Sequence, residues 1–285
     1  MSNDGRLRQC PPNWPLSDSS AQKALERAFQ KRSIDFSRPG FCDAEPFLRA
    51  ERLDARFLET YARYVEVRPY DDTYLNMARR KIEIVAEAVR SAVASDGRMG
   101  ACVHASGTVA RMLDRLQIWN YVAKATLTIT FGTSDHEPQY FWVLDEGNFV
   151  ASHAIVVAPP YGVVDVTVKQ QPYPPDIGAL VPEIVLADQF EHSTWTPDDL
   201  ANPVLQMAVR AMGVPFGDYL KRTQPQMLEV MSALPARLVL AGSVELKYVP
   251  VTIGGFVEQL EELTGYQPGG RAAIDIFQTD VLPKL

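Results

Sequence analysis

Near Trp119 the spacing of apolar side chains changes from the period of a helix to that of a strand, and this change restricts the fold more than any other feature. Up to about Leu116 the apolar residues recur every three or four positions, which is typical of amphipathic helices. From Trp119 they alternate, and YVAKATLTITF is followed by QYFWVLD, HAIVVA and GVVDVTVKQ with no helical pattern between them. Strands that follow one another so closely pair in antiparallel fashion, because parallel strands need a long crossover. The sequence therefore predicts an α+β fold.

Turn residues and caps give the expected limits of the elements. Helices are predicted over 21–32, 45–68, 73–94 and 102–116, and the chain breaks at Pro39-Gly40 and Pro69. After the strands, helices are expected from Pro197 and over 215–234, a strand over 237–251 and a short helix over 254–266. The predicted organisation is a helical N-terminal region (1–95), a core (96–175) and a mixed C-terminal extension (176–285), packed together as one compact domain.

Composition excludes several classes of function. Thirty-five acidic residues against 28 basic ones give a formal charge of −7, so nucleic acid and anionic membranes are not expected partners. No run approaches the roughly 20 apolar residues of a membrane span, and the first residues lack the apolar segment of a secretory signal. The odd count of three cysteines predicts a reducing compartment, and we expect a cytoplasmic protein. Metal-ligand spacings and phosphate-binding loops are missing from the sequence, so no metal or cofactor is predicted.

Cys102 is the first candidate for chemistry. It follows the glycine-containing connector SDGRMG and stands at the first turn of a predicted helix. The unpaired N–H groups and the positive end of the helix dipole stabilise a thiolate at this position, and the thiolate is the reactive form of cysteine. The alternative interpretation is a small buried apolar residue, which describes most lone cysteines.

His153 and Asp165 strengthen the first interpretation. His153 opens one predicted strand, and Asp165 lies twelve positions later in the next. If the two strands form a hairpin at Pro159-Pro160, the two residues come near opposite positions, where Cβ atoms are about 5 Å apart. Asp165 could then hold one imidazole nitrogen while the other faces Cys102. This is the arrangement of nucleophile, base and orienting acid in a catalytic triad.

These residues resemble the pattern of the transglutaminase-like superfamily, whose catalytic core is papain-like. The matching pieces are GACVHASGTVARMLDRLQI and, after about fifty residues, SHAIVVAPPYGVVDVT. The resemblance implies an antiparallel sheet packed on the nucleophile helix. It also implies Cys102 as nucleophile, His153 as general base and acid, and Asp165 as the residue that orients the imidazole. Ile155 stands where the family commonly has an aromatic residue, and Val166 where it commonly has proline, so the resemblance implies a divergent member.

The resemblance implies chemistry at amide bonds: transglutaminase, deamidase or protease activity on a protein, peptide or small amide, through a thioester. Two alternatives stay open. The chain could be a catalytically inactive interaction protein whose N-terminal helices bind a partner. It could also be an acyl-CoA-dependent N-acyltransferase, although the arginine-glycine-glycine run of arylamine N-acetyltransferases is replaced by Arg98-Met99-Gly100-Ala101. The sequence does not name a second oxyanion donor. Structural or surface roles are expected for the other polar candidates, Gln139, Tyr140, Trp142, His104, His136 and His192.

Overall fold

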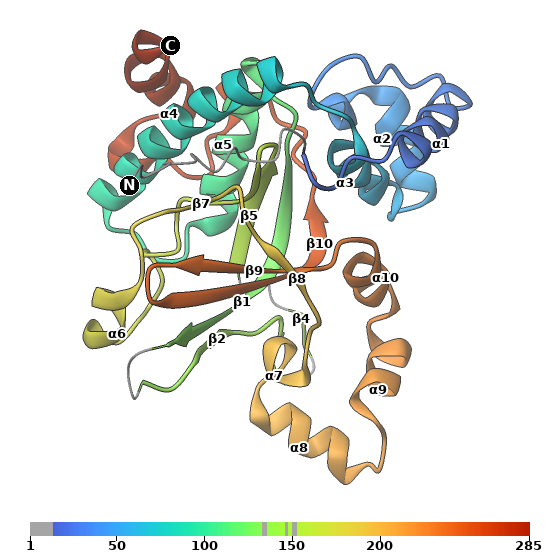
Figure 1. The fold of residues 1–285 in the computed structure, drawn as a ribbon, viewed down its shortest axis with the longest axis vertical. Helices are drawn as coiled ribbons and strands as arrows, with labels where there is room; N and C mark the ends of the chain where they lie inside the picture. Colours follow the sequence, from blue (N-terminus) through green and yellow to red (C-terminus); the bar gives the residue numbers. More distant parts are fainter. Residues whose placement is uncertain (1–13, 133–135, 146–147, 150–152) are drawn as a thin grey trace, which may run out of the picture.

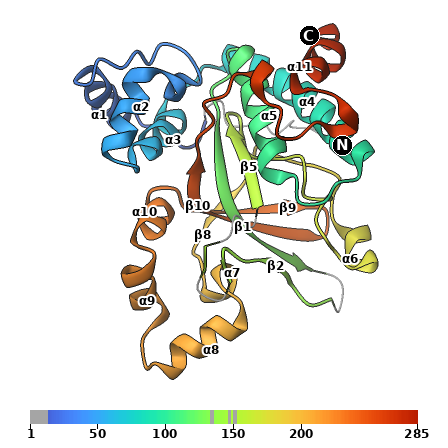
Figure 2. The same ribbon diagram turned by 180° about the vertical axis from the view of Figure 1, so that it is seen from behind.

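A curled antiparallel sheet forms the centre of the protein (Figures 1 and 2). The structure is a computed structural model that describes residues 14–132, 136–145, 148–149 and 153–285. The strand order is β7–β6–β5–β1–β10–β9–β8, and β2 pairs with a further stretch of β1. All of these pairs are antiparallel, so the predicted α+β class is confirmed. The strands are β1 (Tyr121–Phe131), β2 (Gln139–Phe141), β5 (His153–Ala158), β6 (Tyr161–Asp165), β7 (Val185–Ala187), β8 (Glu191–Ser193), β9 (Ala236–Ala241) and β10 (Val244–Gly254). A separate small pair is formed by β3 (Leu144–Asp145) and β4 (Asn148–Phe149).

The long strands β1 and β10 join the middle of the chain to its last third. They pair from Val122–Gly254 to Phe131–Val244, with one bulge after Lys124. Their apolar side chains are fully buried in the core, as expected for a sheet covered by helices. The C-terminal extension therefore contributes a central strand of the sheet.

Three N-terminal helices pack as a group beside the sheet (Figure 1): α1 (Ser19–Gln30), α2 (Glu45–Leu53) and α3 (Phe57–Val67). Their contacts are mainly aromatic, and Phe29 touches Phe41 and Tyr64 edge to face at 5.1 and 5.5 Å between ring centroids. The single helix predicted over 45–68 is wrong. The chain turns at Asp54, whose carboxylate accepts a hydrogen bond from the Arg56 N–H at 3.1 Å.

Helices α4 (Asp72–Asp96) and α5 (Cys102–Arg115) cover one face of the sheet (Figure 2). The apolar face of α5 is buried against Val122 of β1 and against Ala154 and Val156 of β5. Ser106 adds a hydrogen bond to the Ala154 carbonyl at 3.0 Å. Gly107 is required on this helix because a Cβ atom there would lie 2.4 Å from the ring of Phe256. The helix that begins at Cys102 thus packs directly on the antiparallel sheet.

The remaining helices follow β6. They are α6 (Pro175–Leu180), α7 (Pro197–Leu200), α8 (Pro203–Ala211), α9 (Phe216–Thr223), α10 (Pro225–Ala233) and α11 (Ala273–Ile276). Asp199 ties the α7–α10 group to the sheet, since it accepts hydrogen bonds from Thr128 at 2.8 Å and Lys247 at 2.7 Å. The helix predicted over 254–266 is wrong, because only Leu260–Glu262 forms a single 3₁₀ turn. Within the described ranges, no helix is both long and apolar enough for a membrane crossing.

Candidate active site

Cys102 is the first residue of α5, as the sequence predicts, and it is 4% exposed. The connector before it turns through two glycines with positive φ, Gly97 and Gly100. The N–H of Gly100 donates to the Gln170 carbonyl at 3.3 Å, which fastens the connector to the segment after β6. Ala101 precedes the helix, and its side chain has no atom that could cap it. The first N–H groups of α5, which have no partner within the helix, therefore belong to the same helical turn as Cys102.

His153 and Asp165 occupy adjacent strands of the sheet. His153 is the first residue of β5 and pairs with Ala125 of β1. Asp165 is the last residue of β6, and β5 and β6 form the predicted hairpin at Pro159-Pro160. Val156 pairs with Val164, so Asp165 is displaced along the hairpin from His153 but points to the same face.

The two side chains are in contact. Nε2 of His153 lies 2.6 Å from Oδ2 of Asp165, and neither side chain is exposed. Asp165 also accepts hydrogen bonds from the Thr167 N–H at 2.9 Å and from the Tyr248 hydroxyl at 3.1 Å. A buried carboxylate without such partners would be costly. Here the donors hold both oxygens, so the orientation of Asp165 is fixed.

These contacts control the protonation of His153. Burial lowers its pKa, but the Asp165 charge and, more weakly, the Cys102 thiol outweigh burial and raise the pKa to about 10. Nδ1 of His153 is buried, and among the described residues it has no hydrogen bond of normal geometry. The thiol of Cys102 is nevertheless close enough to interact with the ring. The structure therefore brings together the three residues that the sequence singled out, with His153 in the middle.

Aromatic side chains surround the imidazole. The Tyr248 ring stacks on His153 at 6.3 Å, and the Phe141 ring lies 6.4 Å away. Phe141 also contacts Tyr173 edge to face at 5.6 Å. Sequence reasoning missed Phe141 and Tyr248. The alternation of side chains along β2 was the only signal for Phe141. It places Phe141 on the opposite face of the strand from the adjacent Tyr140.

The other candidate residues lie outside this group. His104 and His192 are exposed, His136 is half-buried, and none of them is in contact with Cys102 or His153. Cys42 is a free thiol beside the C-terminal half of α5, and burial raises its pKa well above the usual range. Cys10 falls outside the described residues. In the part of the chain that the structure describes, no cluster of His, Cys, Asp and Glu has the arrangement of a metal site.

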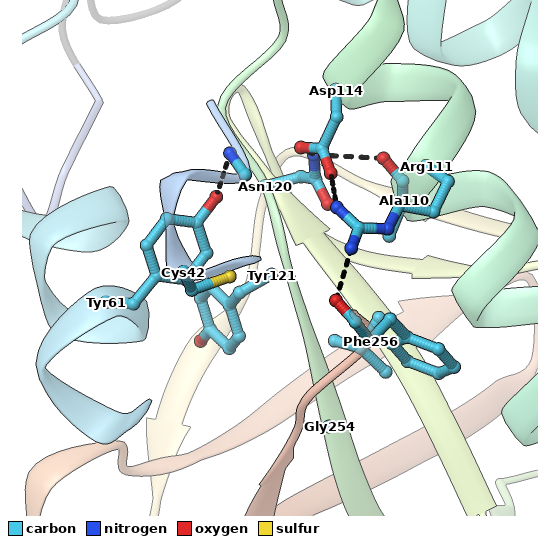
Figure 3. Close-up of a pocket in the computed structure, with 11 residues that line it drawn as sticks. Cys42, Tyr61, Ala110, Arg111, Asp114, Asn120, Tyr121, Gly254 and Phe256 are labelled. Carbon is cyan, nitrogen blue, oxygen red and sulfur yellow. Dashed lines mark hydrogen bonds and ion pairs between the residues drawn. The ribbon is translucent and has the colours of Figure 1, made fainter. Parts of the chain in front are cut away.

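A second polar cluster lies at the other end of α5 (Figure 3). Arg111 is 5% exposed; Nη1 donates to Asp43 at 3.3 Å and to Asp114 at 3.0 Å, and Nη2 donates to the Phe256 carbonyl. Asn120 donates to the other oxygen of Asp114 at 2.9 Å. Burial raises the pKa of Asp114 to about 6, although Arg111 opposes the shift. A cavity of about 20 Å³ beside these residues has room for one water molecule.

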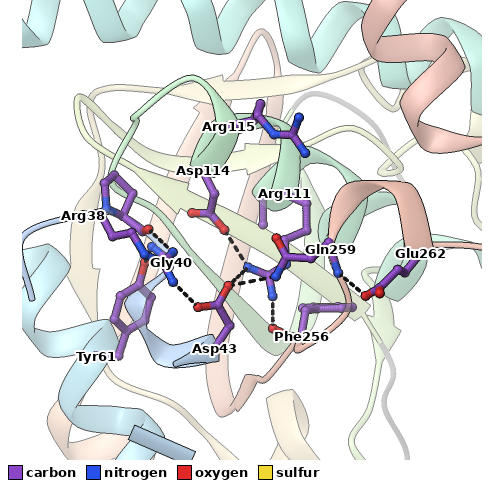
Figure 4. Close-up of polar contacts among 12 residues, drawn as sticks. Arg38, Gly40, Asp43, Tyr61, Arg111, Asp114, Arg115, Phe256, Gln259 and Glu262 are labelled. Atoms are coloured by element: carbon purple, nitrogen blue, oxygen red, sulfur yellow. Dashed lines mark hydrogen bonds and ion pairs between the residues drawn. The ribbon is translucent and has the colours of Figure 1, made fainter. Parts of the chain in front are cut away.

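A larger polar cavity of about 170 Å³ adjoins this cluster (Figure 4). Arg38 donates to Asp43 at 2.5 Å, Gln259 donates to the same carboxylate at 3.2 Å, and Arg115 pairs with Glu261 at 2.6 Å. Each cation at the cavity is thus already paired with an acid. The cluster therefore joins three distant segments of the chain and has no surplus charge for a ligand.

The chain matches no protein-family model, no curated protein and no solved structure. No relative therefore indicates what the site does. The contacts among Cys102, His153 and Asp165 are the basis for a functional conclusion.

Proposed function

We propose that this chain is a cysteine-dependent enzyme that hydrolyses or transfers acyl groups at amide bonds through a thioester on Cys102. One observation carries the proposal: the buried imidazole of His153 is 2.6 Å from Asp165 on one side and interacts with the Cys102 thiol on the other. Perturbed ionisable groups cluster at functional sites, and a thiol and a carboxylate on either side of a histidine are the parts of a thiol-dependent triad.

The first half-reaction forms the thioester. The Cys102 thiolate attacks the amide carbonyl carbon, and the developing oxyanion accepts hydrogen bonds from the N–H groups at the start of α5. The carbon–nitrogen bond then breaks, and the departing amine takes its proton from the imidazolium of His153. Asp165 supports this step because its charge keeps His153 protonated until the amine needs the proton.

The second half-reaction releases the acyl group. Water or an incoming amine attacks the thioester carbonyl and gives a proton to His153, and the carbon–sulfur bond breaks to restore the thiolate. Water gives hydrolysis, and an amine gives acyl transfer. This chemistry is also what the resemblance to the transglutaminase-like superfamily implies, and we propose membership of that superfamily on the same grounds. The substrate class is a protein, peptide or small amide.

Acylation with p-nitrophenyl acetate tests the proposal. We expect a burst of p-nitrophenolate and one acetyl group per chain by intact mass, placed on Cys102 by peptide mapping. Cys102→Ala should abolish the burst and keep the fold, as judged by circular dichroism. His153→Ala should slow acetylation by about a hundredfold or more, the usual contribution of a general base.

Cys42→Ala and Cys10→Ser are the matched controls, and both should leave the burst unchanged. Iodoacetamide should label Cys102 rapidly near neutral pH, well below the pKa of about 8.5 of an ordinary thiol. An acetyl group on Cys42 or Cys10, or a Cys102 that reacts no faster than an ordinary thiol, would contradict the proposal. The latter result would favour a non-catalytic interaction protein.

A further inference from the structure

Phe141 lies beside the imidazole and Tyr173 lies against Phe141, and the mechanism above uses neither residue. Phe141 ends β2 and contacts both the ring of His153 and the ring of Tyr173. Tyr173 follows β6, and its hydroxyl donates to the Val168 carbonyl at 2.7 Å, which fixes the ring in place. We call these two residues the aromatic pair. Phe141 contacts the imidazole directly, and Tyr173 continues the same aromatic surface through its contact with Phe141.

The aromatic pair is the partly exposed boundary of a buried site. His153 and Asp165 are fully buried, whereas Phe141 and Tyr173 are only half-buried. Burial, with the nearby Asp165 charge, raises the pKa of Tyr173, so its phenol stays neutral at physiological pH. The pair therefore offers an uncharged aromatic surface to whatever approaches the imidazole.

The chemistry decides which part of a substrate meets this surface. The acyl carbon is bonded to Cys102 in the intermediate, and its oxygen faces the N–H groups of α5. The amine must lie on the other side, toward His153, because this residue gives it a proton or takes one from it. Groups attached to the amine nitrogen therefore pass next to the aromatic pair, which borders His153.

Given the proposed function, on which this step rests, we propose that Phe141 and Tyr173 recognise the amine portion of the substrate. The amide that Cys102 cleaves or forms then carries a large apolar, preferably aromatic, side chain on its nitrogen side. Contact of such a side chain with one aromatic wall increases reactivity by about tenfold or more, the usual discrimination of an apolar pocket.

Partition of the acetyl-enzyme between two amines tests this inference. The full-length protein is acetylated with p-nitrophenyl acetate at pH 8 in the presence of equal phenylalaninamide and glycinamide. The two N-acetyl products are measured by liquid chromatography, and their ratio is corrected for the uncatalysed reactivity of each amine. We expect a corrected ratio of about ten or more in favour of phenylalaninamide.

Phe141→Ala should reduce this ratio to about one. The ratio compares two products of the same acetyl-enzyme, so a change in the rate of acetylation does not affect it. Tyr140→Ala is the matched control, because Tyr140 is the adjacent aromatic residue on β2 and stacks on Trp142 at 5.6 Å, away from the imidazole. Its ratio should equal that of the wild type. If Phe141→Ala does not fold, Phe141→Leu, which keeps an apolar side chain of similar size, should still lower the ratio.

Three results would overturn the inference: equal use of the two amines by the wild type, an unchanged ratio in the folded Phe141 variants, or hydrolysis with neither amide formed. Failure of the proposed function is a different result, since no acetyl group would then form on Cys102. If Cys102 is acetylated but the enzyme uses both amines equally, only the proposed role of the aromatic pair is rejected.

Discussion

Replacement of Asp165 by asparagine is the most direct test of the electrostatics of the site. Asparagine has nearly the same shape as aspartate, so the variant removes the negative charge and leaves the side-chain volume nearly unchanged. Among the groups that raise the pKa of His153 to about 10, Asp165 has the largest effect, whereas burial lowers this pKa. In Asp165→Asn we therefore expect this pKa to fall to the ordinary value of about 6.5 or below.

The size of this change follows from the linkage between protonation and folding. A pKa unit corresponds to about 1.4 kcal/mol, so the raised pKa of His153 corresponds to a contribution on the order of 5 kcal/mol. Because the pKa is raised in the folded state, this contribution is complete below about pH 6.5. It is lost as the pH rises from about 6.5 toward 10. The wild type should therefore lose stability across this range, and Asp165→Asn should lose much less.

Two measurements check these expectations. The chain contains four histidines, so proton–carbon NMR can follow each imidazole, with His153 assigned by the signal missing in His153→Gln. Urea unfolding at several pH values gives the dependence of stability on pH. If His153 titrates near pH 6.5 in the wild type, or at the same pH in both proteins, the assigned role of Asp165 is wrong.

Two further predictions concern the stability of the buried core, one through packing and one through an ion pair. Gly107→Ala places a Cβ atom 2.4 Å from the Phe256 ring and should lower the free energy of unfolding by about 1–3 kcal/mol. Gly217→Ala, with nothing within 4 Å, should be neutral or stabilising, and equal effects in thermal melts would contradict the reasoning. Glu66→Gln leaves the guanidinium of Arg237, which is 2% exposed, without its carboxylate partner. This should cost about 3–5 kcal/mol in urea unfolding, and a loss below about 1 kcal/mol would show that the buried pair is not needed.

The local pattern of apolar residues was sufficient to predict the helix and the strands that carry Cys102, His153 and Asp165. The apolar period places the start of a helix at Cys102, and β-branched alternation places His153 and Asp165 on neighbouring strands. The structure has these elements at those positions. Such predictions succeed because burial of one helix face or one sheet face leaves a repeat in the sequence.

Long-range contacts explain what the sequence did not predict. The apolar period continues through Leu53, but this side chain is 88% exposed, and a turn at Asp54 separates two helices. The segment 254–266 does not form the predicted helix. Its Phe256 carbonyl instead accepts a hydrogen bond from Arg111 of α5. In the sequence, Tyr248 is one more residue of a strand pattern. Only the pairing of β10 with β1 brings its hydroxyl to Asp165.

The pairing of β10 with β1 also has a consequence for synthesis of the protein. Cys102, His153 and Asp165 all precede β10 in the chain and are therefore synthesised before it. Until β10 pairs with β1, Asp165 lacks the hydroxyl that holds its Oδ2 beside the imidazole. The hydrogen bond from Tyr248 therefore reaches the site only after β10 has been made and has paired with β1.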